Sequence, residues 1–197
     1  MHSRGTHRFL SLLLAAVFTL GGASATRADA LDGLLEVSSA YATPENGVYN
    51  LFARIAYPVN DDIRAALKDG LTLTFDLDVV VSRERRLWVD ETVAEYTLKR
   101  ELNYHAVSDR YVARDVDNRN GSEQHSYATL EEALEALGTV DAWPFLLQQQ
   151  LSPSRTYSVS LRAGVRRGRL PDTLRVLLFW TDDWHRESEW FSWSLPH

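Results

Sequence analysis

The sequence contains no cysteine. Disulfides, thiolate metal sites, iron–sulfur clusters and a cysteine nucleophile are therefore excluded. Basic residues are also scarce, since 21 Lys and Arg stand against 27 Asp and Glu, a net charge of −6. Nucleic acids and anionic lipid surfaces attract basic proteins, so we expect neither as a ligand. A charged fraction of 24% and an aromatic fraction of 11% are typical of a folded globular domain.

The motifs of common enzyme classes are absent as well. The chain has no glycine-rich dinucleotide or phosphate loop, no Gly-x-Ser-x-Gly nucleophile elbow and no His-Glu-x-x-His zinc motif. Past residue 30 the histidines are His105, His125, His185 and His197, and no two of them have the spacing of metal ligands. We therefore predict no catalytic residues, no metal site and no cofactor.

The longest segment without charge lies at the N-terminus. Arg4 and Arg8 precede the apolar core Phe9–Leu20, and two Ala-x-Ala sites follow it. This order is typical of a secretory signal peptide, which predicts export to the periplasm. We expect cleavage after Ala30, with Ala25 as the alternative. A retained membrane anchor is the competing interpretation, because the uncharged stretch of 18 residues has the minimum length of a spanning helix.

Removal of residues 1–30 would leave 167 residues with a net charge of −8, since three Arg and one Asp are lost. A chain of this size buries roughly 70% of its unfolded surface and can hold a core without cross-links. No repeat, low-complexity tract or Pro/Gly-rich linker divides it. We predict a single domain over residues 31–197, with no stable membrane insertion after cleavage.

Alternation of apolar and polar residues dominates the rest of the chain. A period of two indicates a strand with one buried face. The segments with this pattern are Tyr49–Tyr57, Leu71–Ser82, Leu98–Ala106, Tyr157–Arg162 and Phe191–Leu195. Leu174–Trp180 is apolar on both faces, which predicts a central strand covered on both sides. Glu45-Asn46-Gly47 and Asn120-Gly121 predict hairpin turns.

Two short helices interrupt these strands. Asn60 is expected to cap a helix over Asp61–Lys68, with Gly70 in a left-handed conformation after its end. Thr129 and Glu132 form a capping box before a second helix. Neither helix is long enough to be stable alone, so both must pack on a sheet. The combination predicts a mainly β fold, a two-layer antiparallel β-sandwich, Ig-like in general architecture, with two short helices.

A basic run followed by a tryptophan is the first candidate binding surface. Its residues are Arg83, Arg85, Arg86, Trp88 and Asp90. Guanidinium groups bind carboxylates in a bidentate manner and stack on aromatic rings, so the run suits an anionic group of a ligand or partner. The simpler interpretation is a charged strand end, with the tryptophan in the core and Asp90 or Glu84 paired to an arginine.

A group of aromatic residues near the C-terminus is the second candidate. Its members are Trp180, Trp184, Trp190, Phe191 and Trp193. Alternation places Trp180 and Trp193 in the core, whereas Trp184 and Trp190 need not be buried. An exposed tryptophan is typical of a recognition surface. Packing at the edge of the sandwich is the favoured interpretation of the group as a whole.

The order of motifs along the chain resembles a known family. The segments that carry the resemblance are Gly70-Leu71-Thr72-Leu73-Thr74-Phe75, Arg83-x-Arg85-x-x-Trp88, Leu102-x-Tyr104-His105-x-Val107, Tyr127-Ala128-Thr129-Leu130 and Ser188-Glu189-Trp190. They are similar to the proteobacterial exported family of domain of unknown function (DUF) number 4390. The resemblance implies a periplasmic or envelope protein with no assigned catalytic residues, and it suggests an accessory role beside a membrane sensor histidine kinase.

Together these observations favour a non-enzymatic module that binds an envelope or membrane protein through an edge strand or an Arg/Trp surface. One alternative is a small-molecule or lipid-binding sandwich with a cavity between its sheets, although the aromatic content favours a filled core. The other is an envelope enzyme that uses dispersed residues such as His105 and Asp90.

Overall fold

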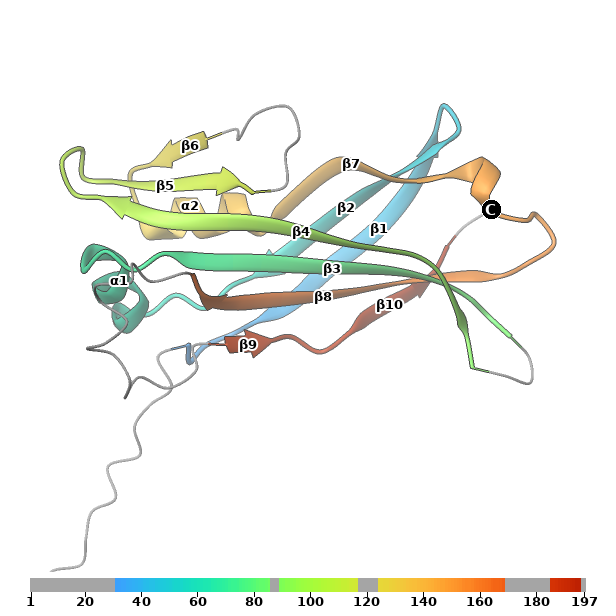
Figure 1. Ribbon diagram of the computed structural model, residues 1–197, viewed down its shortest axis with the longest axis horizontal. Coiled ribbons are helices and arrows are strands. Elements are labelled where there is room, and N and C mark those ends of the chain that lie inside the picture. The colour runs from blue at the N-terminus through green and yellow to red at the C-terminus, as the bar shows by residue number, and fades with distance from the viewer. Residues whose placement is uncertain (1–30, 86–88, 117–123, 169–184, 196–197) are drawn as a thin grey trace, which may run out of the picture.

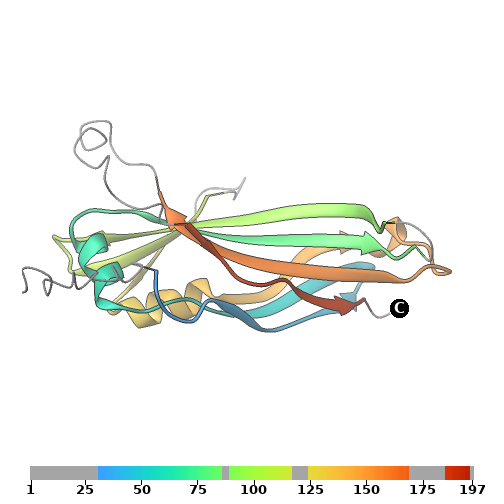
Figure 2. The same ribbon diagram turned by 90° about the horizontal axis from the view of Figure 1, so that it is seen from below.

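Two antiparallel sheets lie face to face in the structure (Figure 1, Figure 2). The computed structural model describes residues 31–85, 89–116, 124–168 and 185–195, and the statements that follow concern these residues. The small sheet has the order β1-β2-β7, with bounds Glu36–Glu45, Val48–Ala56 and Thr139–Leu147. The large sheet has the order β10-β8-β3-β4-β5-β6, with bounds Phe191–Ser194, Tyr157–Arg167, Leu73–Arg83, Glu91–His105, Arg110–Asp115 and Gln124–Tyr127. A short strand β9, His185–Glu187, pairs with β8 on the same side as β10.

The predicted two-layer sandwich with two short helices is confirmed. Each segment with the alternating pattern contains a strand, and β4 extends much further toward the N-terminus than the pattern indicates, to Glu91. The turn between β1 and β2 has positive φ angles at Asn46 (51°) and Gly47 (82°), as a tight hairpin turn requires.

The sequence pattern does not predict the short strand β9, and it does not predict strand β7. Pro144 stands inside it, and Ala142 has a φ of 49°, so the pairing with β2 is irregular there. Both features remove the regular alternation that marks a strand. A 3₁₀ turn, η1, follows at Gln148–Gln150. The predicted strand Leu174–Trp180 and the predicted turn Asn120-Gly121 lie outside the described residues.

The core lies between the two sheets and follows from the period of two. The residues of β3 and β8 that face it are Leu73, Phe75, Leu77, Val79, Val81, Val159, Leu161, Ala163 and Val165, all at most 4% exposed. The ring of Trp143 in β7 packs edge to face against the ring of Tyr96 in β4, with 5.7 Å between the ring centres, and so connects the two sheets. A void among these core side chains, next to Tyr57, measures about 10 Å³, less than the space of one water molecule. Burial raises the pKa of the Tyr57 hydroxyl far above its usual value.

Both helices begin where the sequence predicts, after Asn60 and after Thr129. Helix α1 spans Asp61–Lys68, and the Ile63 amide donates to Asn60 Oδ1 at 2.8 Å. Gly70 has the expected positive φ, 92°. Neither described helix is long and apolar enough to cross a membrane.

Helix α2 spans Leu130–Leu137, and the Glu132 amide donates to Thr129 Oγ1 at 3.2 Å. The Glu132 carboxylate accepts from the Ala128 amide, one residue earlier than in a standard capping box. Gly138 ends the helix with an ordinary negative φ, but a Cβ there would lie 2.1 Å from the Ile55 carbonyl oxygen. Close approach to β2 is therefore the reason for glycine. Figure 2 shows α2 in the same layer as the small sheet, covering the part of the large sheet that β1, β2 and β7 leave open.

Candidate binding surface

The predicted basic run lies at the end of β3 and the start of β4. Arg83 and Arg85 both donate to the same carboxylate oxygen of Glu91. Asp90 accepts from the Arg85 backbone amide at 3.1 Å. A charged strand end therefore describes these residues, with Glu91 in the place predicted for Asp90 or Glu84. Arg86 and Trp88 lie outside the described residues.

The aromatic group divides between the core and the surface. Trp193 and Phe191 pack against the buried cluster, as alternation predicts. Trp190 is 46% exposed, so edge packing describes Trp193 but not Trp190. Trp180 and Trp184 lie outside the described residues.

Trp190 is stacked by an arginine of the neighbouring strand. Arg162 Cζ of β8 lies 4.6 Å from the centre of the indole ring, a cation–π geometry. The same guanidinium donates to Asp78 Oδ2 at 3.2 Å, and its Nη1 lies 2.6 Å from Glu187 Oε2. One side chain thus links strands β3, β8 and β9 to the exposed tryptophan.

Further polar residues extend this network across the large sheet. Thr97 of β4 donates to Asp78 at 2.8 Å. Arg166 holds Asp76 with two nitrogens, at 2.9 and 3.3 Å. We define the outer-face cluster as the residues Asp76, Asp78, Thr97, Lys99, Arg162, Gly164, Arg166, His185, Glu187 and Trp190.

Strand register brings these residues together. Asp76 pairs with Gly164 and Asp78 with Arg162, while Glu187 of β9 pairs with Gly164 from the other side. Because odd-numbered residues of β3 and β8 point into the core, these even-numbered ones share the opposite face.

A buried serine positions Trp190. Between β9 and β10 the Ser188 amide donates to the Ala163 carbonyl at 2.8 Å, and Ser188 Oγ accepts from the Ala163 amide at 3.0 Å. Side chain and backbone together replace the ladder bonds missing at this interruption. The next strand, which begins at Phe191 opposite Leu161, then places Trp190 beside Arg162.

The outer-face cluster surrounds a hollow of about 240 Å³. Gly164 forms part of its lining, between Asp76 and Glu187. A Cβ on Gly164 would meet its nearest atoms at 3.8–3.9 Å, which is ordinary contact, and the residue's φ is not in the left-handed region. Neither the backbone nor the packing therefore requires glycine, and its missing side chain leaves the hollow open.

Burial raises the pKa of Asp76, and the cations of Arg166 and Lys99 act in the opposite direction. Arg162 Nε is buried and has no hydrogen-bond partner among the described residues. The hollow is therefore lined by charges that are partly removed from water, where electrostatic interactions are stronger than at an open surface.

A second hollow, of about 210 Å³, opens near the end of α2. Its arginines have structural roles: Arg100 donates to the carbonyls of Leu137 and Thr139 at 2.8 and 3.2 Å and so caps the helix. Arg114 is bound by Glu101 at 2.5 Å.

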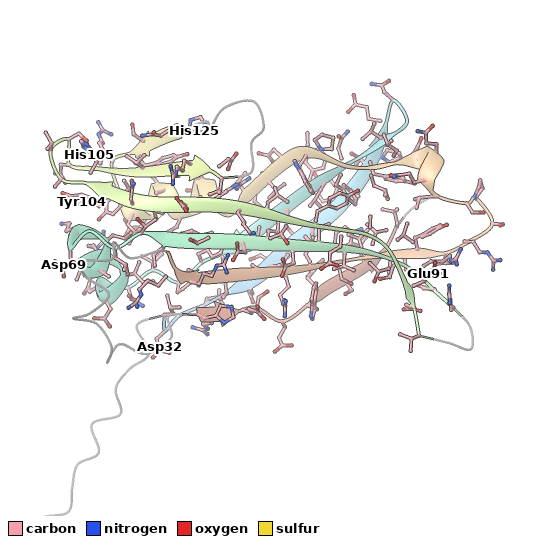
Figure 3. The ribbon with its side chains drawn as sticks, viewed as in Figure 1. Asp32, Asp69, Glu91, Tyr104, His105 and His125 are labelled. Atoms are coloured by element: carbon pink, nitrogen blue, oxygen red, sulfur yellow. The ribbon has the colours of Figure 1, made fainter. Side chains whose placement is uncertain are left out.

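The predicted site residues do not form one surface. Arg83 pairs with Tyr157 of β8, and Arg162 follows five residues later, roughly 17 Å along the strand. His105 and Asp90 lie even further apart, since the 15 residues of β4 separate them by roughly 50 Å. Figure 3 shows this span, with Glu91 and His105 labelled at its two ends. These two residues cannot act in one catalytic site. Within the described part of the chain, no group of three His, Asp or Glu side chains is arranged to hold a metal ion.

Comparison with known proteins identifies a family but no characterised relative. The family model described as domain of unknown function (DUF4390) matches residues 33–194. No curated protein and no solved structure matches the chain. Because the match covers more than half of the sequence, the chain belongs to the DUF4390 family.

Proposed function

We propose that the protein is a non-enzymatic module of the cell envelope that binds a partner protein through its outer-face cluster. The observation that carries the proposal is Trp190, half-exposed and stacked by an arginine that also holds two carboxylates. Tryptophan and arginine are the residues most enriched among those that dominate binding energy at interfaces.

The fixed position of Arg162 supports this role. Its contacts with Asp78 and Glu187 hold the side chain in place before any partner arrives. A side chain that is already ordered loses little conformational entropy on binding, so more of the contact energy becomes affinity. Trp190 has only two side-chain torsions and gains the same advantage from the stacked arginine.

Compartment and partner class come from the sequence. The signal-peptide pattern of residues 1–30 supports export to the periplasm. The net charge of −6, or −8 without those residues, disfavours a nucleic acid or an anionic lipid surface. We place the partner among envelope or membrane proteins. The resemblance to the DUF4390 family, and not the composition, suggests a membrane sensor kinase as the specific candidate.

The filled core favours this proposal over a carrier of lipids or other small molecules. Among the described core residues, the void between the sheets next to Tyr57 holds about 10 Å³, whereas pockets for small molecules measure roughly 300–1,000 Å³. The outer face, in contrast, has both an exposed aromatic ring and a hollow.

Site-specific photo-crosslinking in cells tests the proposal. p-Benzoyl-phenylalanine would replace Trp190 in one strain and Tyr41 in the other. Tyr41 is the matched control, because it is 54% exposed on the outer face of the small sheet and stacks on Phe52 at 4.9 Å. We expect a discrete adduct with one envelope protein from position 190 and none from position 41.

Arg162→Ala in the position-190 strain should reduce the adduct strongly, because the cluster then loses its central contact. An adduct of equal yield from both positions, or none from position 190 in the exported protein, would refute binding at this face.

A further inference from the structure

We propose that the hollow beside Trp190 is a subsite for the carboxylate of an acidic side chain on the partner protein. This inference rests on the proposed function, since it specifies the chemistry that the partner presents to the outer-face cluster. The residues that line the hollow are Asp76, Asp78, Thr97, Lys99, Arg162, Gly164, Arg166, His185 and Glu187.

The carboxylates of the hollow already have partners. Asp76 is held by Arg166, Asp78 by Arg162 and Thr97, and Glu187 by Arg162. The arginine beside each carboxylate offsets its negative charge, so a further cation from a partner gains less there.

Lys99 differs from the other charged residues of the lining. Its ammonium group makes no hydrogen bond or ion pair within 4 Å to the described residues, and it acts on Asp76 only through longer-range attraction. Lys99 brings the cations of the lining to three, equal to its three carboxylates, and the three donors of the Lys99 ammonium group have no described partner in direct contact. The group that suits them is a single anionic acceptor, and an Asp or Glu carboxylate is the one that proteins supply.

The size of the hollow favours one side chain over a free small molecule. Its volume of about 240 Å³ lies below the range of roughly 300–1,000 Å³ that small-molecule pockets occupy. Trp190, stacked on Arg162 at the hollow, offers an apolar surface to a neighbouring residue of the same partner segment. The paired Asp76, Asp78 and Glu187 disfavour a ligand with several negative charges.

Gly164 supplies a variant that closes the hollow without harming the fold. Valine there would fill the space that the missing side chain leaves, and its Cβ would meet no atom closer than 3.8 Å. Glycine weakens the interior of a strand, so Gly164→Val should leave the melting temperature unchanged or raise it. Gly164→Ala, a smaller step, should weaken binding without abolishing it.

Titration of the ¹⁵N-labelled exported protein with N-acetyl-glutamic acid amide tests the subsite, with the Gly164 amide as the NMR reporter. N-acetyl-glutamine amide and N-acetyl-lysine amide serve as comparison probes. We expect saturable shifts with the glutamic acid probe alone. Lys99→Gln should weaken binding by roughly tenfold, the effect of losing a charge-assisted hydrogen bond. Lys68→Gln is the matched control. Lys68 is the last residue of α1, and its ammonium group lies 5.8 Å from the ring centre of Tyr104 in β4, away from the hollow.

Equal shifts with the glutamine or lysine probe would overturn the carboxylate assignment, as would unchanged binding in a folded Gly164→Val variant. The crosslinking strain separates this outcome from failure of the proposed function. An adduct at position 190 that keeps its full yield in Gly164→Val refutes the subsite and leaves partner binding intact. If the glutamic acid probe binds but no adduct forms at position 190, the proposal of a protein partner is refuted and the carboxylate subsite stands.

Discussion

The outer faces of the two sheets carry the same kinds of residue in different arrangements. On the small sheet, Tyr41 is 54% exposed and Arg54 pairs with Asp141 at 2.9 Å. On the large sheet, Trp190 is 46% exposed and Arg162 pairs with Asp78 at 3.2 Å. Each face therefore combines a half-exposed aromatic ring with a cross-strand Arg–Asp pair.

The difference lies in whether the aromatic ring and the ion pair share a residue. Tyr41 stacks on Phe52, its own cross-strand neighbour, at an interplanar angle of 7°. On the large sheet, Arg162 belongs to both the stack and the ion pair, and it is only 30% exposed, compared with 53% for Arg54. Ion pairs that share a residue and are partly buried contribute more to stability than isolated, exposed ion pairs.

The largest expected effect is on partner binding. Trp190→Ala should weaken affinity for the crosslinked partner by about 30-fold, or roughly 2 kcal/mol, as expected for a central interface tryptophan. Tyr41→Ala should change it less than about twofold, because that ring lies on the opposite layer. Binding assays with the purified partner measure both. Similar losses of affinity in the two variants would show that the two outer faces do not differ in their role in binding.

The next effect concerns stability. Arg162→Ala should lower the free energy of unfolding by about 1–2 kcal/mol, because Asp78 and Glu187 both lose a partner in a half-buried setting. Arg54→Ala should change it by no more than about 0.5 kcal/mol, since Arg54 and Asp141 are both mostly solvated. Urea unfolding at neutral pH measures both changes. Equal destabilisation by the two substitutions would mean that the ion pairs of Arg162 contribute no more than an exposed surface pair.

A smaller loss should follow from Ser188→Ala. The Ala163 amide then lacks its acceptor at a buried position, which costs about 1 kcal/mol, and Trp190 loses the support that places it on Arg162. Ser192→Ala removes only the exposed contact with Ser160 at 2.8 Å and should be nearly neutral. Tryptophan fluorescence upon partner binding should therefore change less in Ser188→Ala than in Ser192→Ala, and equal changes in the two variants would contradict the positioning role.

The smallest effect is a difference in pH dependence. The pKa of Asp76 is raised in the folded state, so this side chain takes up a proton on folding as the pH falls toward its usual pKa of 3.8. Its contribution to stability therefore increases on acidification. Glu131, whose pKa is lowered from 4.5 by its hydrogen bond with Arg64, contributes stability above that value and loses it below.

Asp76→Asn should therefore make stability fall more steeply as the pH falls toward 3.8, and Glu131→Gln should make it fall less steeply below pH 4.5. Urea midpoints at a series of pH values give both slopes. If both substitutions change the slope in the same direction, burial does not govern the pKa of Asp76.

Local signals predict much of the fold, because alternation and capping depend on residues close in sequence. Asn60 and Thr129 identify both helix starts, and the pattern of β3 separates its buried from its exposed face. Strand β7 escapes prediction where Pro144 and Ala142 break the same pattern.

The candidate site depends on pairing between distant residues, which local patterns do not encode. Arg162 and Trp190 meet because β10 pairs with β8 in one register, and a shift of one residue would place the ring on the other face. One signal was available: Trp190 has the same phase as Ser192 and Ser194, the exposed residues of the terminal strand. Gly164 carried no such signal, because only the strands on both sides show that its missing side chain leaves a hollow.

The interruption at Ser188 also limits how copies of the protein can associate. Unpaired strand edges are templates for aggregation, and proteins commonly shorten or break them. At the edges of the large sheet, β6 has four residues on one side, and β9 and β10 have three and four residues on the other. Strand β4, with 15 residues, pairs with β3 along most of its length, whereas β5 pairs only with Arg100–His105. Among the described residues, Glu91–Leu98 of β4 therefore has no partner strand on the β5 side. Within the described part of the chain, a second copy of this protein therefore meets short edges at β6, β9 and β10 and one longer edge along the first part of β4.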